Sequence, residues 1–425
     1  MTIAIFLTSL MGAMTLGVPI AFSLLVCGVA LMVHLNSFDT QILAQNLLEG
    51  ANNYPLMAVP FFMLAGELMN AGGLSRRIVD VANALVGHVR GGLGYTAIIA
   101  AVVMASISGS AVADTAALAA LLIPMMRKAG YNVPRAAGLI ASGGIIAPII
   151  PPSIGFVVFG VAAQVSITKL FMAGIVPGVM MGVALGITWW FLAKKEPLVN
   201  GGEFSLAKVG SAIVSGTWAL ALPIVIIGGM KFGVFTPTEA AVVAVVYSLG
   251  VGLFVYGELK LAELPALMLA AAKTSSTIMF LVATALVSAW LITIADIPAQ
   301  AVALLQPFMD SPRLLMLVMM LLVIVVGTAL DFMPTVLILT PILMPVVRQA
   351  GIDPVYFGVM FIINNAIGLL TPPVGTVLNV VAGVARVNLD KVIKGVWPFL
   401  LAQTVLLLLF VLFPQLITGP ATWFR

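Results

Sequence analysis

Residues 122–130 read LIPMMRKAG, and residues 343–351 read LMPVVRQAG. Both stretches follow the pattern Leu-x-Pro-x-x-Arg-x-Ala-Gly, and each is followed by two adjacent prolines, at 151–152 and at 372–373. The offset between the copies is 221 residues throughout this region. Matches among apolar residues arise easily by chance, whereas an ordered recurrence of Pro, Arg and Gly does not. The pattern therefore indicates an internal duplication.

The duplication extends toward the N-terminus at an offset of 218 residues. The matching positions there are Pro19 with Pro237, Phe62 with Phe280, Ala65 with Ala283, and Gly109 with Gly327. We therefore predict two repeats, residues 1–200 and residues 201–425.

The composition predicts a membrane protein. Of the 425 residues, 62% are hydrophobic and only 8% are charged, and the mean hydropathy is +1.20, whereas soluble domains carry about 25% charged residues. The net charge of +4 is explained by basic cytoplasmic loops and requires no nucleic acid partner. The sequence has no nucleotide-binding or zinc motif. We therefore expect a protein that is not an enzyme, has no organic cofactor and does not itself use ATP.

Apolar runs predict an all-α polytopic fold with about ten to twelve transmembrane helices. The first run shows no basic region or cleavage site before it, so we interpret it as a retained helix. The spans are expected at 2–17, 19–35, 55–72, 136–164, 169–193, 210–230, 237–256, 274–292, 355–385 and 396–418.

Two further apolar stretches, 94–126 and 314–347, do not fit this pattern. Each is too long for one upright helix and too short for two spans with a turn. Both carry small or kinking residues near the middle, so we expect two re-entrant helical hairpins. Irregular backbone at that depth is tolerated only where it is buried in protein or lines a cavity.

Basic residues predict the orientation. Arg76, Arg77 and Arg90 precede the first hairpin, whereas the equivalent segment 292–311 has no Lys or Arg. Since basic loops stay in the cytoplasm, segments 36–54 and 292–311 are expected outside, together with both termini. Five crossings, an odd number, separate equivalent points, so the repeats are expected to be inverted. Inverted repeats with broken helices are typical of secondary transporters.

Each predicted hairpin contains one acid. Asp114 follows Ser108-Gly109-Ser110, and Asp331 follows Gly327-Thr328. A carboxylate at membrane depth is costly unless it is paired, which makes it a candidate functional residue. With nearby hydroxyls and freed carbonyls it would form a site of hard oxygen ligands suited to Na⁺. The alternative is that the hydroxyls bond to helix carbonyls while each Asp caps the second hairpin helix.

The spans at 136–164 and 355–385 are expected to be broken by their prolines, because two adjacent prolines remove two backbone donors. New helix ends leave N–H groups that can hold a carboxylate and carbonyls that can hold a cation. The alternative is a simple kink. The residues at these breaks are Pro148, Pro151, Pro152, Ser153 and Gly155 in the first, and Asn364, Asn365, Thr371, Pro372, Pro373, Gly375 and Thr376 in the second.

Two other features are less specific. Glu67 could be a proton or cation site, or it could pair with Arg76 or Arg77 near the cytoplasmic boundary. Residues 74–92 have an apolar and a polar face, which predicts an interfacial amphipathic helix. Such a helix could join a static scaffold to a mobile bundle.

Three stretches resemble one family. The run Ala105-Ser106-Ile107-Ser108-Gly109-Ser110-Ala111-Val112-Ala113-Asp114-Thr115, the stretch Pro148-Ile149-Ile150-Pro151-Pro152-Ser153, and Gly368-Leu369-Leu370-Thr371-Pro372-Pro373-Val374-Gly375 are similar to the large membrane subunit of TRAP transporters, the DctM type. The resemblance covers essentially the whole chain.

The resemblance implies a bacterial inner-membrane uptake system that uses a Na⁺ gradient to import organic acids by an elevator motion. It implies two partners, a periplasmic solute-binding protein and a small DctQ-type membrane subunit, here expected as a separate polypeptide. Carboxylate substrates in the family include C4-dicarboxylates, keto acids and sugar acids.

The resemblance and the residues together give the expected sites. Na⁺ is expected at two. The first is Ser108, Ser110, Asp114 and Ser153; the second is Asp331, Asn365 and Thr371. The substrate carboxylate is expected near Gly109, Pro151, Pro152, Pro372, Gly375 and Thr376.

Two alternatives remain open at the level of sequence. A stand-alone Na⁺- or H⁺-coupled anion symporter would share the hairpins and repeats but need no binding protein. A structural or channel-like membrane protein is the third class, and the paired, charged breaks argue against it.

Overall fold

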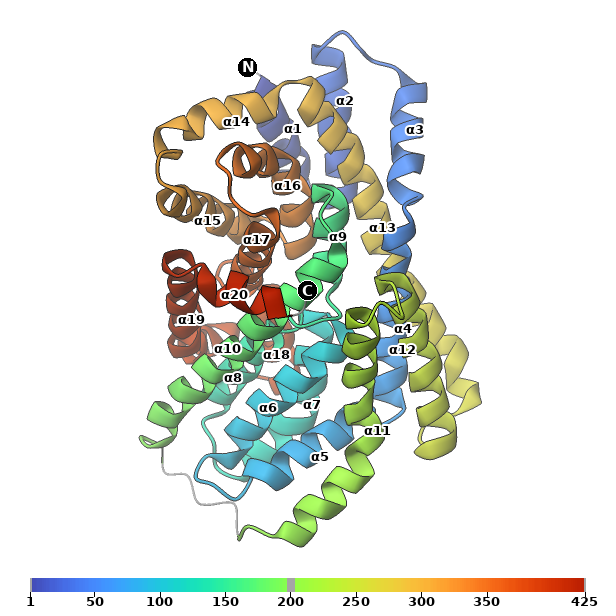
Figure 1. The fold of residues 1–425 in the computed structure, drawn as a ribbon, viewed down its shortest axis with the longest axis vertical. Coiled ribbons are helices and arrows are strands. Elements are labelled where there is room, and N and C mark those ends of the chain that lie inside the picture. The colour runs from blue at the N-terminus through green and yellow to red at the C-terminus, as the bar shows by residue number, and fades with distance from the viewer. Residues whose placement is uncertain (1, 197–202, 424–425) are drawn as a thin grey trace.

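The computed structural model describes residues 2–196 and 203–423, and all regular secondary structure in these ranges is helical (Figure 1). Up to residue 196 the helices are α1 (Thr2–Thr15), α2 (Ile20–His34), α3 (Thr40–Ala51), η1 (Tyr54–Met57), α4 (Ala58–Ala71), α5 (Leu74–Val86), α6 (Gly92–Ser108), α7 (Ala111–Lys128), α8 (Val133–Gly144), α9 (Ile154–Ala163) and α10 (Ile167–Ala193). From residue 203 they are α11 (Leu206–Lys231), α12 (Pro237–Gly250), η2 (Val251–Val255), η3 (Leu261–Glu263), α13 (Leu264–Ile294), α14 (Ile297–Leu305), η4 (Gln306–Phe308), α15 (Pro312–Ala329), α16 (Phe332–Gln349), α17 (Pro354–Gly368), α18 (Thr376–Ala385), α19 (Leu389–Leu412) and α20 (Gln415–Trp423). The predicted boundary between the repeats, at residues 200 and 201, lies outside the described ranges.

By length and composition, six helical segments of the described ranges could cross a membrane. A seventh is the pair formed by η1–α4 and α5, which is bent by 64°. The multi-span, all-helical prediction is therefore confirmed, with fewer long spans than the ten to twelve expected. Most of the remaining apolar helices, of 10–17 residues, belong to the predicted hairpins and broken spans, where breaks divide the apolar runs. The six segments are Ile167–Ala193, Leu206–Lys231, Pro237–Val255, Leu261–Ile294, Phe332–Gln349 and Leu389–Leu412.

The two stretches predicted as hairpins each fold as two helices that pack together, α6 with α7 and α15 with α16. Figure 1 shows the first pair in the lower half of the molecule and the second in the upper half. The first break lies at Gly109, whose φ of +63° is in the left-handed region that glycine adopts easily. The second lies at Leu330, where the backbone becomes extended. Both breaks thus fall beside the predicted acids.

The two proline-rich spans are interrupted as well. Residues 145–153 separate α8 from α9, and residues 369–375 separate α17 from α18. Each interruption contains a cis Pro-Pro bond, at Pro151–Pro152 and at Pro372–Pro373. The first interruption therefore places irregular backbone inside the protein, whereas in the second Pro372 is partly buried and Pro373 is exposed.

The second helix of each hairpin packs against the last broken helix of the other half: α7 contacts α18, and α16 contacts α9. The repeated arginines hold these contacts. Arg127, at the end of α7, donates to the carbonyl oxygen of Ala385 at 2.6 Å, and Arg348, at the end of α16, donates to that of Ala163 at 2.9 Å. Both acceptors end a helix, where carbonyls lack intrahelical donors. The Arg of the repeated motif therefore joins the two halves in both directions.

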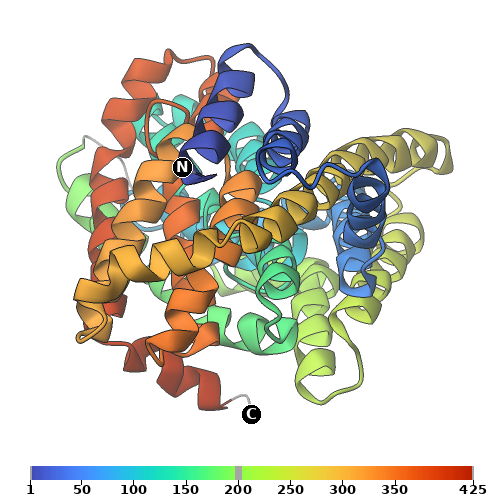
Figure 2. The same cartoon turned by 90° about the horizontal axis from the view of Figure 1, so that it is seen from above.

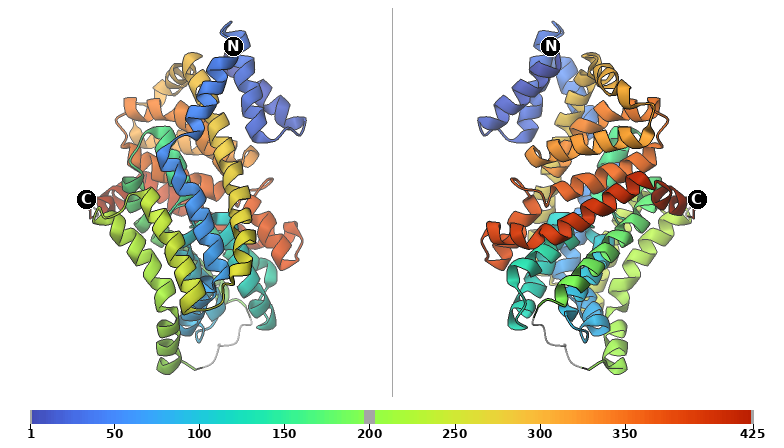
Figure 3. Two further views of the ribbon diagram at one scale, coloured as in Figure 1. Left: turned by 90° about the vertical axis from the view of Figure 1, so that its right-hand side faces the viewer. Right: turned by 90° about the vertical axis from the view of Figure 1, so that its left-hand side faces the viewer.

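The remaining helices pack around these elements. Helices α2, α3 and α4 lie against α13, which crosses the molecule diagonally when seen from above (Figure 2). Helices α10 and α19 lie side by side on another face, as the right-hand view of Figure 3 shows. The expected span at 274–292 is part of the longer α13.

Segment 36–54, expected as an outside loop, contains helix α3. The Asp39 carboxylate caps this helix by accepting from the backbone N–H of Gln41 at 2.7 Å. Gly50 lets the helix approach Ala283 closely, since a Cβ there would lie 3.1 Å from the Ala283 backbone. The apolar pattern does not reveal α3, because its mixture of polar and apolar residues does not form an apolar run.

The suggested pairing of Glu67 with Arg76 or Arg77 is wrong. Both arginines instead pair with Glu258, at 2.6 and 2.8 Å, in the connection between η2 and η3. The sequence could not reveal this partner, because Glu258 lies about 180 residues away. Two ion pairs therefore anchor the start of α5 to the helices that follow α12.

Candidate functional site

The first hairpin break is closed around its acid. Asp114, in the first turn of α7, is 1% exposed and accepts a hydrogen bond from the hydroxyl of Ser108. The Ser108 hydroxyl also accepts from the backbone N–H of Ser110 at 3.2 Å. Ser108, Ser110 and Asp114 therefore lie together, as expected. The other carboxylate oxygen of Asp114, Oδ2, is buried without a hydrogen-bond partner in the part of the chain that the structure describes.

The cap of α7 is Ser110, whose hydroxyl oxygen accepts from the N–H of Ala113. Asp114 is therefore not needed as a cap, which argues against the alternative that this acid only caps the second hairpin helix. A buried carboxylate oxygen without a partner is costly. The arrangement is suited to a cation that would supply the missing interaction.

A small cavity lies beside this cluster, between the hairpin and the bend from α4 to α5. Asn70 and Ser75 line it together with Ser108 and Asp114, and the Ser75 hydroxyl donates to the amide oxygen of Asn70. The sequence did not predict these two residues as members of the site. Their polarity could have indicated it, because they flank Gly72-Gly73 between an apolar span and an amphipathic helix.

The first double-proline break contacts the first hairpin break directly. A Cβ at Gly109 would lie 2.4 Å from the Pro152 carbonyl oxygen and 3.2 Å from the Ser153 Cα. Ser153 itself is fully buried, donates to the Pro148 carbonyl and accepts from the N–H of Phe156 at 3.1 Å. Its hydroxyl is thus the cap of α9 and makes no hydrogen bond with Asp114.

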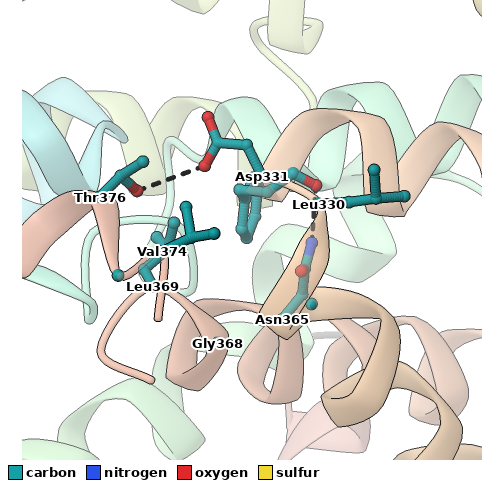
Figure 4. Close-up of a pocket in the computed structure, with 10 residues that line it drawn as sticks. Leu330, Asp331, Asn365, Gly368, Leu369, Val374 and Thr376 are labelled. Carbon is teal, nitrogen blue, oxygen red and sulfur yellow. Dashed lines mark hydrogen bonds between the residues drawn. The ribbon is translucent and has the colours of Figure 1, made fainter. Parts of the chain in front are cut away.

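The second centre is more open. Asp331 is exposed and accepts from the Thr376 hydroxyl at 3.3 Å, and the Asn365 amide donates to the Phe332 carbonyl at 2.7 Å (Figure 4). Asp331 stands at the position that precedes α16, but its side chain makes no capping hydrogen bond. These side chains and Gly375 line one pocket between α15, α16, α17 and α18. The structure therefore brings Asp331, Asn365, Gly375 and Thr376 together.

Two expected members lie outside this pocket. Thr371 donates to the carbonyl of Ile367 at 3.0 Å, within its own segment, and neither it nor Pro372 lines the pocket. The hydroxyl that donates to Asp331 belongs to Thr376 instead. The sequence could not distinguish the two threonines, since the fold of the break between them decides which one faces the acid.

The first broken helix contacts the second hairpin. A Cβ at Gly155, just inside α9, would lie 2.8 Å from the ring of Phe332, the first residue of α16. The start of one broken helix thus packs on the start of the opposite hairpin helix. The described residues contain no group of three or more His, Cys, Asp or Glu side chains placed to hold a metal ion. The groups that gather are hydroxyl, amide and carboxylate oxygens, which hold hard cations such as Na⁺.

The family model described as "Tripartite ATP-independent periplasmic transporter, DctM component" matches residues 7–416. The chain belongs to this family. It is therefore a TRAP transporter large permease subunit, a multi-pass membrane protein of a bacterial transport family and not an enzyme, as the sequence motifs predicted.

Individual relatives agree with this assignment. The permease is 58% identical to the 2,3-diketo-L-gulonate TRAP transporter large permease protein of Escherichia coli, over the whole of both chains. It is 38% identical to the isethionate TRAP transporter permease protein DctMQ of Oleidesulfovibrio alaskensis, over 93% of this chain and 62% of that one. Among solved structures, the YdaH transporter of Alcanivorax borkumensis matches with a TM-score of 0.61 and 16% identity over 88% of each chain, a likeness of fold alone.

Proposed function

We propose that this permease is the large membrane subunit of a tripartite, Na⁺-coupled secondary transporter in the bacterial inner membrane. It imports an organic acid that a periplasmic solute-binding protein delivers. The observation that carries the proposal is the acid at each hairpin break. Asp114 has a buried oxygen without a partner among the described residues, and Asp331 lies with Asn365 and Thr376 at one pocket.

Two Na⁺ sites follow from these surroundings. The first would use the carboxylate of Asp114 with the hydroxyl of Ser108, next to the cavity that Asn70 lines. The second would use Asp331 with the Thr376 hydroxyl and the amide oxygen of Asn365. Bound Na⁺ would neutralise each carboxylate and hold the two sides of each break together.

The substrate carboxylate fits best at the start of α18. Helix α9 has the Ser153 hydroxyl as its cap, whereas Gly375, which precedes α18, has no side chain to cap that helix. The first N–H groups of α18 have no side-chain cap and could therefore bind an anion, and Gly375 and Thr376 line the Asp331 pocket. A Na⁺ ion at Asp331 would offset the repulsion between that acid and the substrate.

The elevator motion fits the packing of the halves. We propose that residues 1–200 and 201–425 are inverted repeats, and that helices α6 to α9 and α15 to α18 move as one body. The crossed contacts of α7 with α18 and of α16 with α9 support this, because they join the hairpins and broken helices of both halves.

The substrate class and partners come from relatives. The full-length relative named for 2,3-diketo-L-gulonate supports a keto or sugar acid as the first substrate to test. The isethionate permease DctMQ, whose name joins the M and Q components, supports a small DctQ-type partner.

The test is uptake of 2,3-diketo-L-gulonate into liposomes that contain the permease and its small subunit, with an imposed Na⁺ gradient. We expect accumulation that requires both Na⁺ and the binding protein. Asp114→Asn and Asp331→Asn should each reduce Na⁺-dependent uptake roughly 10- to 100-fold, the range that corresponds to loss of an interaction with a charged group. Asp310→Asn, which changes an exposed acid outside both centres, is the matched control.

Unchanged Na⁺ dependence in both site variants would disprove the site assignment. Equal uptake without the binding protein would instead favour the stand-alone symporter.

A further inference from the structure

A basic cavity lies at the end of the candidate span α10, away from both hairpin breaks. Its volume is about 480 Å³, and the walls come from α5 and the segment after it, from α6 and from α10. Arg90 and Lys194 supply positive charge, and Tyr95 and Trp190 supply aromatic rings. The aliphatic part of the wall is Val86, Val89 and Ala193.

The charges of this cavity are held in place. Arg90 donates to the carbonyl oxygen of Glu196 at 2.8 Å and to that of Lys194 at 3.3 Å. The Lys194 ammonium lies 3.2 Å from the centroid of the Trp190 ring. The nearby carboxylate of Glu196 is paired with Arg135 at 2.6 Å. Among the described residues, neither Arg90 nor Lys194 forms an ion pair with an acid.

The sequence of α10 indicates the level of the bilayer at which the cavity lies. The 27-residue apolar helix ends at Ala193, and Lys194 and Lys195 follow directly. Trp190 lies one turn before that end. Tryptophan and basic residues at the end of a span lie at the level of the lipid headgroups. The cavity therefore opens where lipid phosphates are located.

An exposed apolar stripe leads from the cavity along α10. Val179, Val183, Ile187 and Trp190 recur at helical spacing and are 46%, 56%, 56% and 47% exposed. Residues spaced by three or four positions share one face of a helix. A ligand that follows this surface has an anionic head and a long apolar tail.

We propose that this cavity binds the headgroup of an anionic phospholipid, such as phosphatidylglycerol, whose acyl chain lies along the α10 stripe. Basic pockets between transmembrane helices on the cytoplasmic side are suited to such headgroups. The bound lipid contacts the end of α5, the start of α6 and the end of α10 at once, so it joins the amphipathic helix to the first hairpin.

The test is a titration of the purified full-length permease in neutral detergent with phosphatidylglycerol, with bound lipid counted by native mass spectrometry. We expect Lys194→Gln to weaken binding of the first phosphatidylglycerol about fivefold, the effect of one basic residue at a membrane surface. Lys195→Gln removes the same charge from the adjacent position, which does not line the cavity, and should leave binding within about twofold. Arg90→Gln is the second variant, and size-exclusion chromatography checks that all variants remain folded.

Three results would overturn the proposal. Equal weakening by Lys194→Gln and Lys195→Gln would indicate diffuse surface attraction. Equal binding of phosphatidylcholine would remove the role of negative charge. Displacement of the lipid by soluble glycerol phosphate at equal concentration would indicate a site for a small anion.

Discussion

Each hairpin break has an acid near it, but the two acids differ in position and in surroundings. At the first, Asp114 is buried under Ser108, and Gly109 packs onto the Pro152 carbonyl. At the second, Asp331 is exposed, and the nearest atom to a Cβ at Gly327 would be 3.8 Å away. The glycine of the first hairpin is therefore tightly packed, whereas that of the second meets only ordinary van der Waals contacts. The residue types at the two breaks are alike, whereas Asp114 is buried and Asp331 is exposed.

The largest expected effect concerns the glycines. Gly109→Ala should lower the free energy of unfolding by about 2–5 kcal/mol, because alanine resists a φ of +63° and its Cβ would overlap the Pro152 carbonyl. Gly327→Ala should be nearly neutral, since the added methyl within a helix makes only ordinary van der Waals contacts, the nearest 3.8 Å from the Asn365 amide oxygen. Thermal unfolding of the two purified variants gives the comparison. Similar melting temperatures for both would contradict the difference in packing.

An intermediate effect is expected for the hydroxyls that contact the acids. Ser108→Ala leaves the buried Asp114 without its hydrogen bond, which should cost about 1–3 kcal/mol. Thr376→Val should have little effect on stability, because water can replace the hydroxyl beside the exposed Asp331. Thermal unfolding in buffers with and without Na⁺ measures both. If Na⁺ stabilises the Ser108→Ala variant as much as the unaltered protein, Ser108 does not take part in the first ion site.

The smallest effect is expected for the arginine contacts, in which the two halves are alike. Arg127→Gln and Arg348→Gln should each destabilise the protein by about 1 kcal/mol, the typical net value of one hydrogen bond. Both arginines are exposed and donate to the last carbonyl of a broken helix. Equal shifts in melting temperature are expected. Loss of stability in only one variant would show that the crossed contacts are not equivalent, and Lys128→Gln, at the neighbouring position, is the control for charge.

Much of this architecture could be predicted from sequence, because its signals are local. Prolines, glycines and acids in long apolar runs marked both hairpins and both broken helices. Ser108, Ser110 and Asp114 came together because six residues of sequence and one turn connect them.

What the sequence could not predict depends on tertiary packing. Glu258 is the partner of two arginines that precede it by about 180 residues. Thr376, rather than Thr371, faces Asp331 because of the path of the chain between 369 and 375. Asn70 and Ser75 reach the first centre only because α4 and α5 bend by 64° beside the hairpin. These choices depend on how helices dock, which no local pattern encodes.

The reciprocal arginine contacts bear on how the chain is made. The acceptor of Arg127 is Ala385, 258 residues later, and Arg348 reaches back 185 residues to Ala163. While the ribosome is still synthesising the second half, the first half has a guanidinium without its carbonyl and a helix end without its donor. The contact of Arg127 can therefore form only when synthesis has reached the last tenth of the chain, and the two halves reach their final packing together.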